Sequence, residues 1–484
     1  MKLSAAICER ARQSRDARFD GRFFIAVVTT RVFCRPTCPV QPPLAKNVRF
    51  YSTAAAALAA GFRPCLRCLP ELAPGNRMAT SGPALVRHAL KRIDDGYLDD
   101  GTVADLAAEL QVTPRHLTRL FEQHVGASPH RVAHTRRLLF AKHLLDESTL
   151  SIAEIAYASG FGSLRRFNSV VKATWQRTPG ALRRHRAVAG GHESIRLRLG
   201  YRPPFDWAGL LDFFAGRAIP GVESVADGCY RRSFRLDGQV GGFSVAPAGG
   251  DGHALELHAR IPDIRLLPEL VTRVRRMFDL DADLLAVASV LGRDPLLSPV
   301  MKRHAGIRVP GAWDPFEIAV RAILGQQISV AAARTLASRL VAEFGEALDD
   351  APAQEPDRLF PVPACLADAR LESLGVVGTR AEAIRRLAQE VADGRIDFSR
   401  PDVASRLVAL PGIGDWTAQY IGMRSGHDPD AFPAADLGLL RGAEEGERMT
   451  PARLRRRAED WRPWRAYAAI CLWRRYTAMT SGGN

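Results

Sequence analysis

Four cysteines that lie close together in the chain constrain its fold more than any other feature of the sequence. Cys34 and Cys38 form a C-x3-C pair, and Cys65 and Cys68 form a C-x2-C pair after 26 intervening residues. Each pair lies in a turn-forming segment, FCRPTCPV or GFRPCLRCLP, so the four thiols can converge on one point. A tetrahedron of thiolates is a ligand set that Zn2+ prefers. The sequence therefore predicts a small domain built around Zn2+ as its cofactor.

The charge of the chain is distributed unevenly, which indicates a polyanionic partner. Residues 1–190 carry 29 Lys and Arg against 14 Asp and Glu, whereas residues 191–484 carry 38 of each. This favours nucleic acid over a membrane surface, because no apolar segment long enough to span a bilayer accompanies the positive charge. The N-terminus also lacks the apolar stretch of a signal peptide. We therefore expect a cytoplasmic protein without membrane contact, in which clustered cysteines bind metal instead of forming disulfides.

Residues 83–187 show a helical pattern with two similar units. TVADLAAEL precedes QVTPRHLTRLFEQHVG, with Thr113 at a helix start, and SIAEIAYAS precedes LRRFNSVVKATW, with Ser163 at a helix start. A short helix, a tight turn and a second, basic helix are typical of a helix-turn-helix. One such unit alone is as compatible with an ordinary helical hairpin that has a solvated basic face. Two in tandem within the basic part favour DNA binding, and we expect major-groove contacts from Arg115, Arg119, Arg165 and Arg166.

After the linker VAGGHES at 188–194 the pattern changes to strands. Four segments alternate apolar and polar residues between Gly-rich turns: SIRLRLGYRPP, GCYRRSFRLDG, GGFSVAPAGG and HALELHARIP. With amphipathic helices at 206–215 and 267–278, they predict an α+β domain that ends near residue 300. From about residue 314 the pattern is helical again.

The C-terminal helical region contains the turn LPGIG, Leu410 to Gly414, between two predicted helices. This is the pattern of a helix-hairpin-helix, in which glycines let a phosphate approach the backbone and the amides of the next helix face it. Such a motif binds DNA without Lys or Arg, so a region with no net charge can still bind DNA. As a single pattern, it also fits a plain tight connection between helices.

Together these motifs resemble known families. Residues 19–70, with FDGRFFIAVVTTRVFCRPTCPV and NVRFYSTAAAALAAGFRPCLRC, resemble the N-terminal domain of the Ada adaptive-response family, and the tandem helix-turn-helix resembles its AraC-type domain. Residues from about 193 onward resemble the 3-methyladenine DNA glycosylase II (AlkA) family of the helix-hairpin-helix superfamily. The resemblance to an Ada–AlkA fusion implies a multidomain, mainly α protein with α+β parts. It divides the chain into a zinc methyl-acceptor domain at 1–78, an AraC-type helix-turn-helix domain at 79–190, an AlkA-like α+β domain at 191–305 and a glycosylase domain at 306–484.

The resemblance to Ada implies that Cys34 accepts a methyl group from a methylphosphotriester in the DNA backbone. Zinc keeps a thiol deprotonated at neutral pH, and the thiolate is the nucleophile. Arg31 and Arg35 flank this cysteine and are expected to hold neighbouring phosphates. Methylation removes one negative charge from the site, which raises DNA affinity and, in the family, activates transcription of repair genes, with RNA polymerase as the expected partner. The alternative is a zinc site that only folds the domain.

The resemblance to AlkA implies that Asp436, in DAFPAADLGLL, is the catalytic carboxylate. It lies some twenty residues past the hairpin, and its charge can stabilise an oxocarbenium-like sugar. Without the hairpin, an Asp before an apolar stretch would be read as a helix N-cap. Residues matching the AlkA base pocket are Trp416, Tyr420 and Trp473, whose rings suit a cationic alkylpurine, although Tyr420 and Trp473 are also compatible with core aromatics. Bifunctional members have a Schiff-base Lys where this chain has Trp416, so the implied reaction stops at an abasic site.

The same resemblance implies further DNA contacts from Gly412 and Gly414 in the hairpin and from Gln326 and Gln327 in LGQQIS. Gln327 takes the position of an apolar wedge in AlkA, and a polar wedge can still fill space and pair with the orphan base. The implied function is a DNA-3-methyladenine glycosylase II, a monomer acting on double-stranded DNA, joined to a methylphosphotriester-sensing activator. The alternative is a regulator whose glycosylase half is inactive and only binds DNA.

Overall fold

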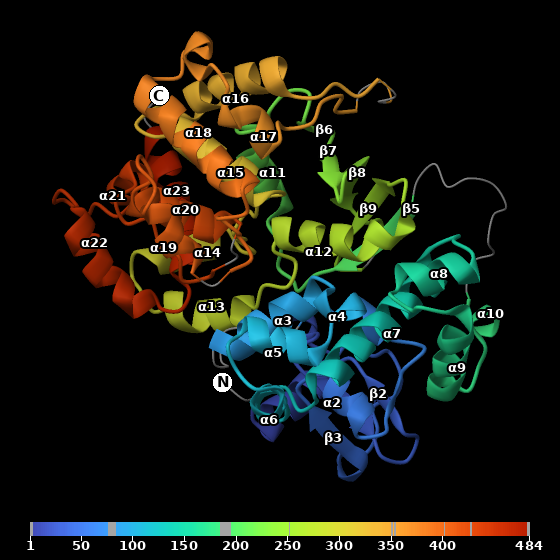
Figure 1. Ribbon diagram of the computed structural model, residues 1–484. Helices are drawn as coiled ribbons and strands as arrows, with labels where there is room; N and C mark the ends of the chain where they lie inside the picture. The colour runs from blue at the N-terminus through green and yellow to red at the C-terminus, as the bar shows by residue number, and fades with distance from the viewer. Residues whose placement is uncertain are drawn as a thin grey trace.

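The computed structural model describes residues 3–75, 84–183, 195–250, 252–349, 352, 355–400, 402–425 and 428–481. The N-terminal half, blue to teal in Figure 1, lies against the sheet in green, and the helical C-terminal part, orange to red, lies beyond it. The expected linker at 188–194 falls outside the described residues. No helix in the described part of the chain combines the length and apolar character needed to cross a membrane.

The first domain contains a small mixed sheet in the order β3-β1-β2-β4. Its strands and helices are β1 (Phe24–Val27), β2 (Val32–Cys34), β3 (Val48–Tyr51), β4 (Arg63–Pro64), α1 (Ala5–Gln13) and α2 (Ala54–Ala59). Strand β1 is antiparallel to β2 and β3, whereas β2 is parallel to β4. Phe33 of β2 is paired with Pro64 of β4. Cys34 and Cys65 each follow one of these paired residues in the chain, so the two cysteines lie side by side at the same end of the two parallel strands. The topology therefore brings the two cysteine pairs together.

The second domain has the two predicted helix-turn-helix units, α5–α6 and α8–α9. Its helices are α3 (Ala84–Asp94), α4 (Tyr97–Asp100), α5 (Val103–Glu109), α6 (Pro114–His124), α7 (Pro129–Glu147), α8 (Ile152–Ala158), α9 (Leu164–Trp175) and α10 (Pro179–Leu182). The side chain of Thr113 accepts a hydrogen bond from the backbone of His116, and that of Ser163 from Arg166. These caps start α6 and α9 where the sequence predicts, because each satisfies a backbone N–H that the first helical turn leaves unpaired.

The third domain is an antiparallel sheet in the order β5-β9-β8-β7-β6, here called the sheet domain. Its elements are β5 (Ile195–Gly200), α11 (Trp207–Ala215), β6 (Glu223–Ala226), β7 (Cys229–Leu236), β8 (Gln239–Pro247), β9 (Ala254–Arg260) and α12 (Leu267–Met277). The alternating pattern of the sequence places Leu197, Leu255 and Leu257 in the core, where none has more than a trace of exposed surface. The strand segments and both helices agree with the α+β prediction.

The fourth domain, here called the helical domain, follows the sheet domain. Its helices are α13 (Leu284–Leu291), α14 (Leu297–Arg303), α15 (Pro315–Leu324), α16 (Val330–Phe344), α17 (Pro363–Ala367), α18 (Gly378–Ala392), α19 (Val403–Val408), α20 (Asp415–Arg424), α21 (Leu437–Gly442), α22 (Pro451–Ala458) and α23 (Arg465–Ser481). One apolar cluster surrounds Ile323 and Leu387, and another surrounds Leu439 and Leu472. Tyr420 packs against both clusters, so α20 lies where they meet.

Arg202 of the sheet domain holds the first domain, here called the zinc domain, against the sheet domain. Arg202 is 2% exposed, and its guanidinium donates to the carbonyls of Asp20 (2.6 Å) and Pro74 (3.3 Å) in the zinc domain. Burial lowers the pKa of Arg202 to about 10, so the side chain remains charged at neutral pH. Arg22 and Asp283 form an ion pair (2.9 Å) across the same contact. The zinc domain and the sheet domain are therefore in direct contact, an arrangement that the sequence does not predict.

Candidate functional site

The four clustered cysteines meet beside the small sheet, with their Sγ atoms all within 4.8 Å of one another. A tetrahedral zinc ion with Zn–S bonds of about 2.3 Å requires S···S separations of about 3.8 Å, so the residues fit this metal. The backbone N–H of Arg35 donates to Cys68 Sγ at 3.3 Å, a contact that favours a thiolate. Cys65 and Cys68 are buried, whereas Cys34 and Cys38 are partly exposed. The cysteine expected to react is thus on the accessible side of the cluster.

The two arginines beside Cys34 have different surroundings. Arg35 Nε donates to Asp20 Oδ1 at 2.8 Å, and its Nη1 donates to the carbonyl of Cys68 at 3.2 Å. Asp20 therefore supplies a counter-charge to Arg35 within the domain, and the contact of Arg35 with phosphate stays a prediction. Arg31 is exposed, with its guanidinium 5.6 Å from the centre of the Phe62 ring. Its contact with phosphate stays a prediction.

The second helix of each helix-turn-helix unit presents its basic residues to solvent. Arg115, Arg119, Arg165 and Arg166 are all exposed. The opposite faces of α6 and α9 are buried, with Leu117 and Phe167 fully inside the domain core. Each helix can therefore enter a groove of DNA without unfolding its packing.

The helix-hairpin-helix turn connects α19 to α20. Gly412 has φ +82°, and a Cβ at this position would lie 2.7 Å from the Cβ of Ala383, so both backbone angle and space require glycine. Gly414 is the N-cap of α20, and a Cβ there would meet open space. The amides that start α20 are therefore accessible to a phosphate, as the motif predicts.

The two glutamines after α15 do not have the same role. Gln326 Nε2 donates to the Gly412 carbonyl (2.9 Å) and to Thr417 Oγ1 (3.1 Å), so this amide holds the hairpin turn, and its contact with DNA stays a prediction. Gln327 is exposed and has φ +58°, a left-handed conformation that is uncommon for a residue with a side chain. Its role as a wedge stays a prediction.

Asp436 lies between two tryptophans at the start of α21. Its Oδ1 accepts from Trp473 Nε1 (2.8 Å) and from the backbone of Leu439 (3.0 Å), and its Oδ2 accepts from Trp416 Nε1 (3.0 Å). Asp436 is thus the N-cap of α21 and, at the same time, a carboxylate oriented by two indoles. Among the described residues, no cationic side chain lies within ion-pair distance of it.

The three predicted pocket aromatics are brought together. Trp416 and Tyr420, four residues apart on α20, stack with ring centres 5.5 Å apart and planes 14° from parallel. Trp473 of α23 meets Tyr420 edge to face at 6.3 Å and 64°. All three rings are partly exposed, which core aromatics would not be. The cluster therefore forms an aromatic wall beside Asp436.

Sequence reasoning missed the glycine that lets this arrangement form. A Cβ on Gly438 would lie 3.0 Å from Trp473 Cδ1 and 3.1 Å from Asp436 Oδ1. Both distances are tighter than most real Cβ contacts, so a larger residue would press on the indole and the carboxylate. The available signal was a glycine in the first turn of an otherwise apolar helix, LGLLRG.

Two arginines beside Tyr420 were also missed. The Tyr420 hydroxyl accepts a hydrogen bond from Arg424 Nη1 at 2.6 Å. Burial raises the pKa of Tyr420, but the charges of Arg424, Arg217 and Arg321 outweigh it and hold the pKa below its ordinary value. Arg424 follows Tyr420 by one helical turn and was therefore detectable by spacing, whereas Arg217 comes from the sheet domain and was not.

These features define a class: a multidomain DNA-binding protein that combines a four-cysteine metal centre, a tandem helix-turn-helix and a helix-hairpin-helix with an aromatic cluster around a single carboxylate. Four family models match successive parts of the chain: metal binding domain of Ada (7–71), helix-turn-helix domain (106–185), AlkA N-terminal domain (196–314) and HhH-GPD superfamily base excision DNA repair protein (320–465). The order of the four matches is the order that the sequence predicts.

Individual relatives match as well. The chain is 41% identical over 478 residues to the probable bifunctional transcriptional activator/DNA repair enzyme AlkA of Mycobacterium tuberculosis (strain ATCC 25618 / H37Rv), covering 96% of this chain and 95% of that one. It is 38% identical over 282 residues to DNA-3-methyladenine glycosylase 2 of Escherichia coli (strain K12), covering 57% of this chain and 95% of that one. The solved 3-methyladenine DNA-glycosylase of Archaeoglobus fulgidus shares the fold, with a TM-score of 0.52 and 23% identity over 59% of this chain and 99% of that one.

The chain belongs to the family of bifunctional transcriptional activator/DNA repair enzymes that join an Ada-type to an AlkA-type region. It is a DNA repair glycosylase combined with a transcriptional activator, and Zn2+ is the metal of its four cysteines. The predictions of fold class, zinc and DNA binding are confirmed.

Proposed function

We propose that this protein excises alkylated purines such as 3-methyladenine from double-stranded DNA, with Asp436 as the catalytic carboxylate. The observation that carries this proposal is the position of Asp436, bound by the indole N–H groups of Trp416 and Trp473 beside the Tyr420 ring. The names of the relatives support the substrate class, because the Escherichia coli protein is a DNA-3-methyladenine glycosylase.

The reaction breaks the bond between C1′ of deoxyribose and the ring nitrogen of the base. The electron pair of this bond moves to the base, which leaves neutral because alkylation had made it cationic. The positive charge that develops on the sugar is stabilised by the Asp436 carboxylate, and water then adds to C1′ and loses a proton. The two indole donors fix the direction of the carboxylate, and among the described residues no cationic side chain lies within ion-pair distance of it.

The absence of an amine at Trp416 predicts a monofunctional enzyme. A Schiff base to the abasic sugar needs a lysine at that position, and an indole nitrogen cannot form one. We therefore expect the DNA strand to stay intact until alkali is added, and borohydride to trap no covalent complex.

The assay that tests this proposal is release of free base from DNA treated with dimethyl sulfate. The expected result is 3-methyladenine released in many turnovers per protein molecule. If the purified protein bound alkylated DNA but released no base, the alternative of an inactive, DNA-binding glycosylase half would be correct.

We also propose that Cys34 accepts the methyl group of a methylphosphotriester. When bound, zinc holds its four ligands as thiolates at neutral pH. The Sγ of Cys34 forms a bond to the methyl carbon while the carbon–oxygen bond breaks, and the electron pair stays on the phosphate oxygen, which restores an anionic diester. Support comes from the partial exposure of Cys34 at the end of β2 and from exposed Arg31 three residues before it.

Mass analysis of the protein after incubation with methylphosphotriester DNA tests this transfer. We expect the peptide that contains Cys34 to gain the mass of one methyl group in place of a hydrogen. An unmodified peptide would support the alternative, a zinc site that only folds the domain.

We further propose that Arg115, Arg119, Arg165 and Arg166 hold promoter DNA, that RNA polymerase is the partner in activation, and that the protein acts as a monomer in the cytoplasm. The four guanidiniums are exposed on α6 and α9, where major-groove contact is possible. Replacing Arg166 with Ala should lower the slope of affinity against salt concentration by about one ion. An unchanged slope in every one of the four alanine variants would exclude these helices as the DNA contact.

A further inference from the structure

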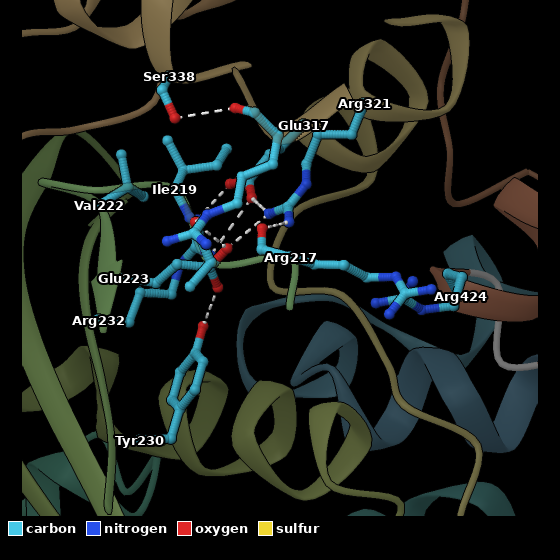
Figure 2. Close-up of polar contacts among 12 residues, drawn as sticks. Arg217, Ile219, Val222, Glu223, Tyr230, Arg232, Glu317, Arg321, Ser338 and Arg424 are labelled. Carbon is cyan, nitrogen blue, oxygen red and sulfur yellow. Dashed lines mark hydrogen bonds and ion pairs between the residues drawn. The ribbon is translucent and has the colours of Figure 1, made fainter. Parts of the chain in front are cut away.

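A network of buried charges joins the sheet domain to the helical domain (Figure 2). Glu223 of β6 and Glu317 of α15, each 4% exposed, accept hydrogen bonds from Arg321 at 2.7 and 2.9 Å. Arg232 of β7 donates to the same two carboxylates at 3.4 and 3.3 Å, and Tyr230 donates to Glu223 at 2.5 Å. Two carboxylates and two guanidiniums therefore balance each other inside the contact between domains.

Two further guanidiniums border this network without a carboxylate of their own. Among the described residues, neither Arg217 nor Arg424 has an acidic side chain within ion-pair distance. Both guanidiniums lie over the ring of Phe213, at 3.8 Å and 4.8 Å from its centre. Figure 2 shows the side chain of Arg217 extending from the network toward Arg424. Like charges this close and this far from bulk water cost free energy, which an electron-rich ligand would offset.

Arg424 uses its donors within the protein. Its Nε and Nη2 donate to the carbonyls of Pro310 (2.6 Å) and Gly311 (3.2 Å), and its Nη1 donates to the Tyr420 hydroxyl (2.6 Å). These three bonds fix its plane. It therefore serves to hold Tyr420 and has little capacity for a ligand.

Arg217 is placed differently. A guanidinium carries five N–H donors; Arg217 uses Nη1 for a long hydrogen bond to the Phe213 carbonyl (3.3 Å), and its side chain also bonds to Tyr420. Its own main-chain carbonyl accepts from Arg321, so the buried network fixes the backbone from which the side chain extends. The result is a cation on a rigid support, beside the Tyr420 hydroxyl at the edge of the aromatic cluster.

The pocket thus presents two different surfaces to an everted base. The faces of Trp416 and Tyr420 suit a cationic ring, whereas the Arg217 guanidinium suits an electron-rich acceptor. An alkylated guanine has both features, a cationic ring and an exocyclic oxygen. An alkylated adenine has the ring charge but carries an amino group, a donor, where guanine has its oxygen.

We propose that Arg217 is a specificity-determining residue of the base pocket, which donates hydrogen bonds to the exocyclic oxygen of an alkylated guanine. The inference rests on the proposed glycosylase function and assigns one part of its substrate range to a side chain of the sheet domain. Because an adenine adduct offers no oxygen at that position, its release does not depend on the donors of Arg217.

Dimethyl sulfate-treated DNA tests this inference within one reaction, because it contains 3-methyladenine, 3-methylguanine and 7-methylguanine. The full-length Arg217→Met variant keeps the aliphatic length of the side chain and loses its donors. We expect the release rates of both guanine adducts to fall about 10- to 100-fold relative to 3-methyladenine, the usual effect of losing a charge-assisted hydrogen bond. Arg217→Lys, which keeps the charge, should show a smaller change in the same direction.

Arg235→Met is the matched control, because Arg235 belongs to the same domain but pairs with Glu346 at the surface. It should leave the ratio of released bases unchanged. If Arg217→Met and Arg217→Lys slowed all three bases equally, Arg217 would only support the fold and the inference would be wrong. If the wild-type protein released no base at all, the proposed function itself would fail, a result that is distinct from an unchanged ratio.

Discussion

The metal centre and the base pocket are assembled in different ways. All four zinc ligands come from one segment of 35 residues, Cys34 to Cys68, within one small sheet. The cluster around Asp436 instead joins Trp416, Asp436 and Trp473 of three helices, and we infer that Arg217 of another domain contributes to it. The zinc centre is therefore a local structure stabilised by its metal, whereas the pocket exists only when distant helices are correctly packed. Substitutions at the two sites should fail in correspondingly different ways.

The largest expected effect is on the metal centre. Cys38→Ser removes one of the four thiolates, and structural zinc contributes on the order of 10 kcal/mol to the folding of small zinc domains. We expect complete loss of bound zinc and of methyl uptake, measured by metal analysis and by mass. Cys365→Ser, which changes an exposed cysteine outside the cluster, should retain both. A Cys38→Ser protein that still held zinc and accepted methyl groups would contradict a four-thiolate centre.

The next effect concerns the indoles that orient Asp436. Trp473→Phe removes the donor at 2.8 Å from Oδ1 and keeps most of the ring. A hydrogen bond to a charged group is worth about 1.5–3 kcal/mol, so the single-turnover rate of base release should fall about 10- to 100-fold. Trp207→Phe removes an indole bond to the carbonyl of Gly228, far from the pocket in sequence, and serves as the control. Equal rates for the two variants would exclude a role for the indole N–H.

A smaller effect is expected where the packing of the pocket is tight. Gly438→Ala places a methyl group close to Trp473 and Asp436, which should displace the indole by a few tenths of an ångström and lower the rate roughly 10-fold or less. Gly422→Ala lies on α20, and its Cβ would make an ordinary contact with Ala431 at 3.7 Å. The Gly422→Ala variant should release base at nearly the normal rate. If Gly438→Ala also left the rate of base release unchanged, the tight packing at this position would have no role in the reaction.

The smallest expected effect concerns the pH dependence of protein stability. It comes from Glu71, which follows the zinc ligand Cys68 by three residues. Burial raises the pKa of Glu71 to about 7, although Lys142 at 3.3 Å opposes the shift. The folded protein thus binds this proton more tightly than the unfolded chain, whose pKa is 4.5. The resulting stabilisation is complete below about pH 4.5 and is lost as the pH rises through 7. Glu71→Gln should therefore reduce the fall in melting temperature between pH 5 and pH 8, by about 2 °C; an identical pH profile would contradict the shifted pKa.

The contrast between a locally built metal centre and a cluster built from distant helices also determines which features could be predicted from the sequence. The cysteine spacing, the caps Thr113 and Ser163 and the hairpin glycines are local signals, and the structure forms each of these elements where the sequence places it. Asp436 caps α21, as one interpretation predicts, and it also accepts a hydrogen bond from Trp416, whereas its catalytic role stays a prediction.

What the sequence could not reveal depends on contacts between distant segments. The sequence did not reveal that Arg35 pairs with Asp20 or that Gln326 holds the hairpin turn. No local sequence signal separates Arg202 from Arg217, and only tertiary packing distinguishes the one that fixes two domains from the one that lies over the Phe213 ring. The count of charged residues identifies the DNA-binding part of the chain. It does not show which guanidiniums already form ion pairs or hydrogen bonds within the protein.

The most direct test of the account is the single-turnover rate of 3-methyladenine release by Asp436→Asn compared with Asp415→Asn. The first change keeps a similar shape and removes the charge between the two indoles, and the second neutralises an exposed carboxylate at the start of α20 that pairs with Arg455 at 3.0 Å. We predict a fall of at least about 100- to 1000-fold for Asp436→Asn, the usual cost of losing electrostatic stabilisation of a transition state, and a near-normal rate for Asp415→Asn. Comparable rates for both variants would show that the carboxylate held by Trp416 and Trp473 does not cleave the base.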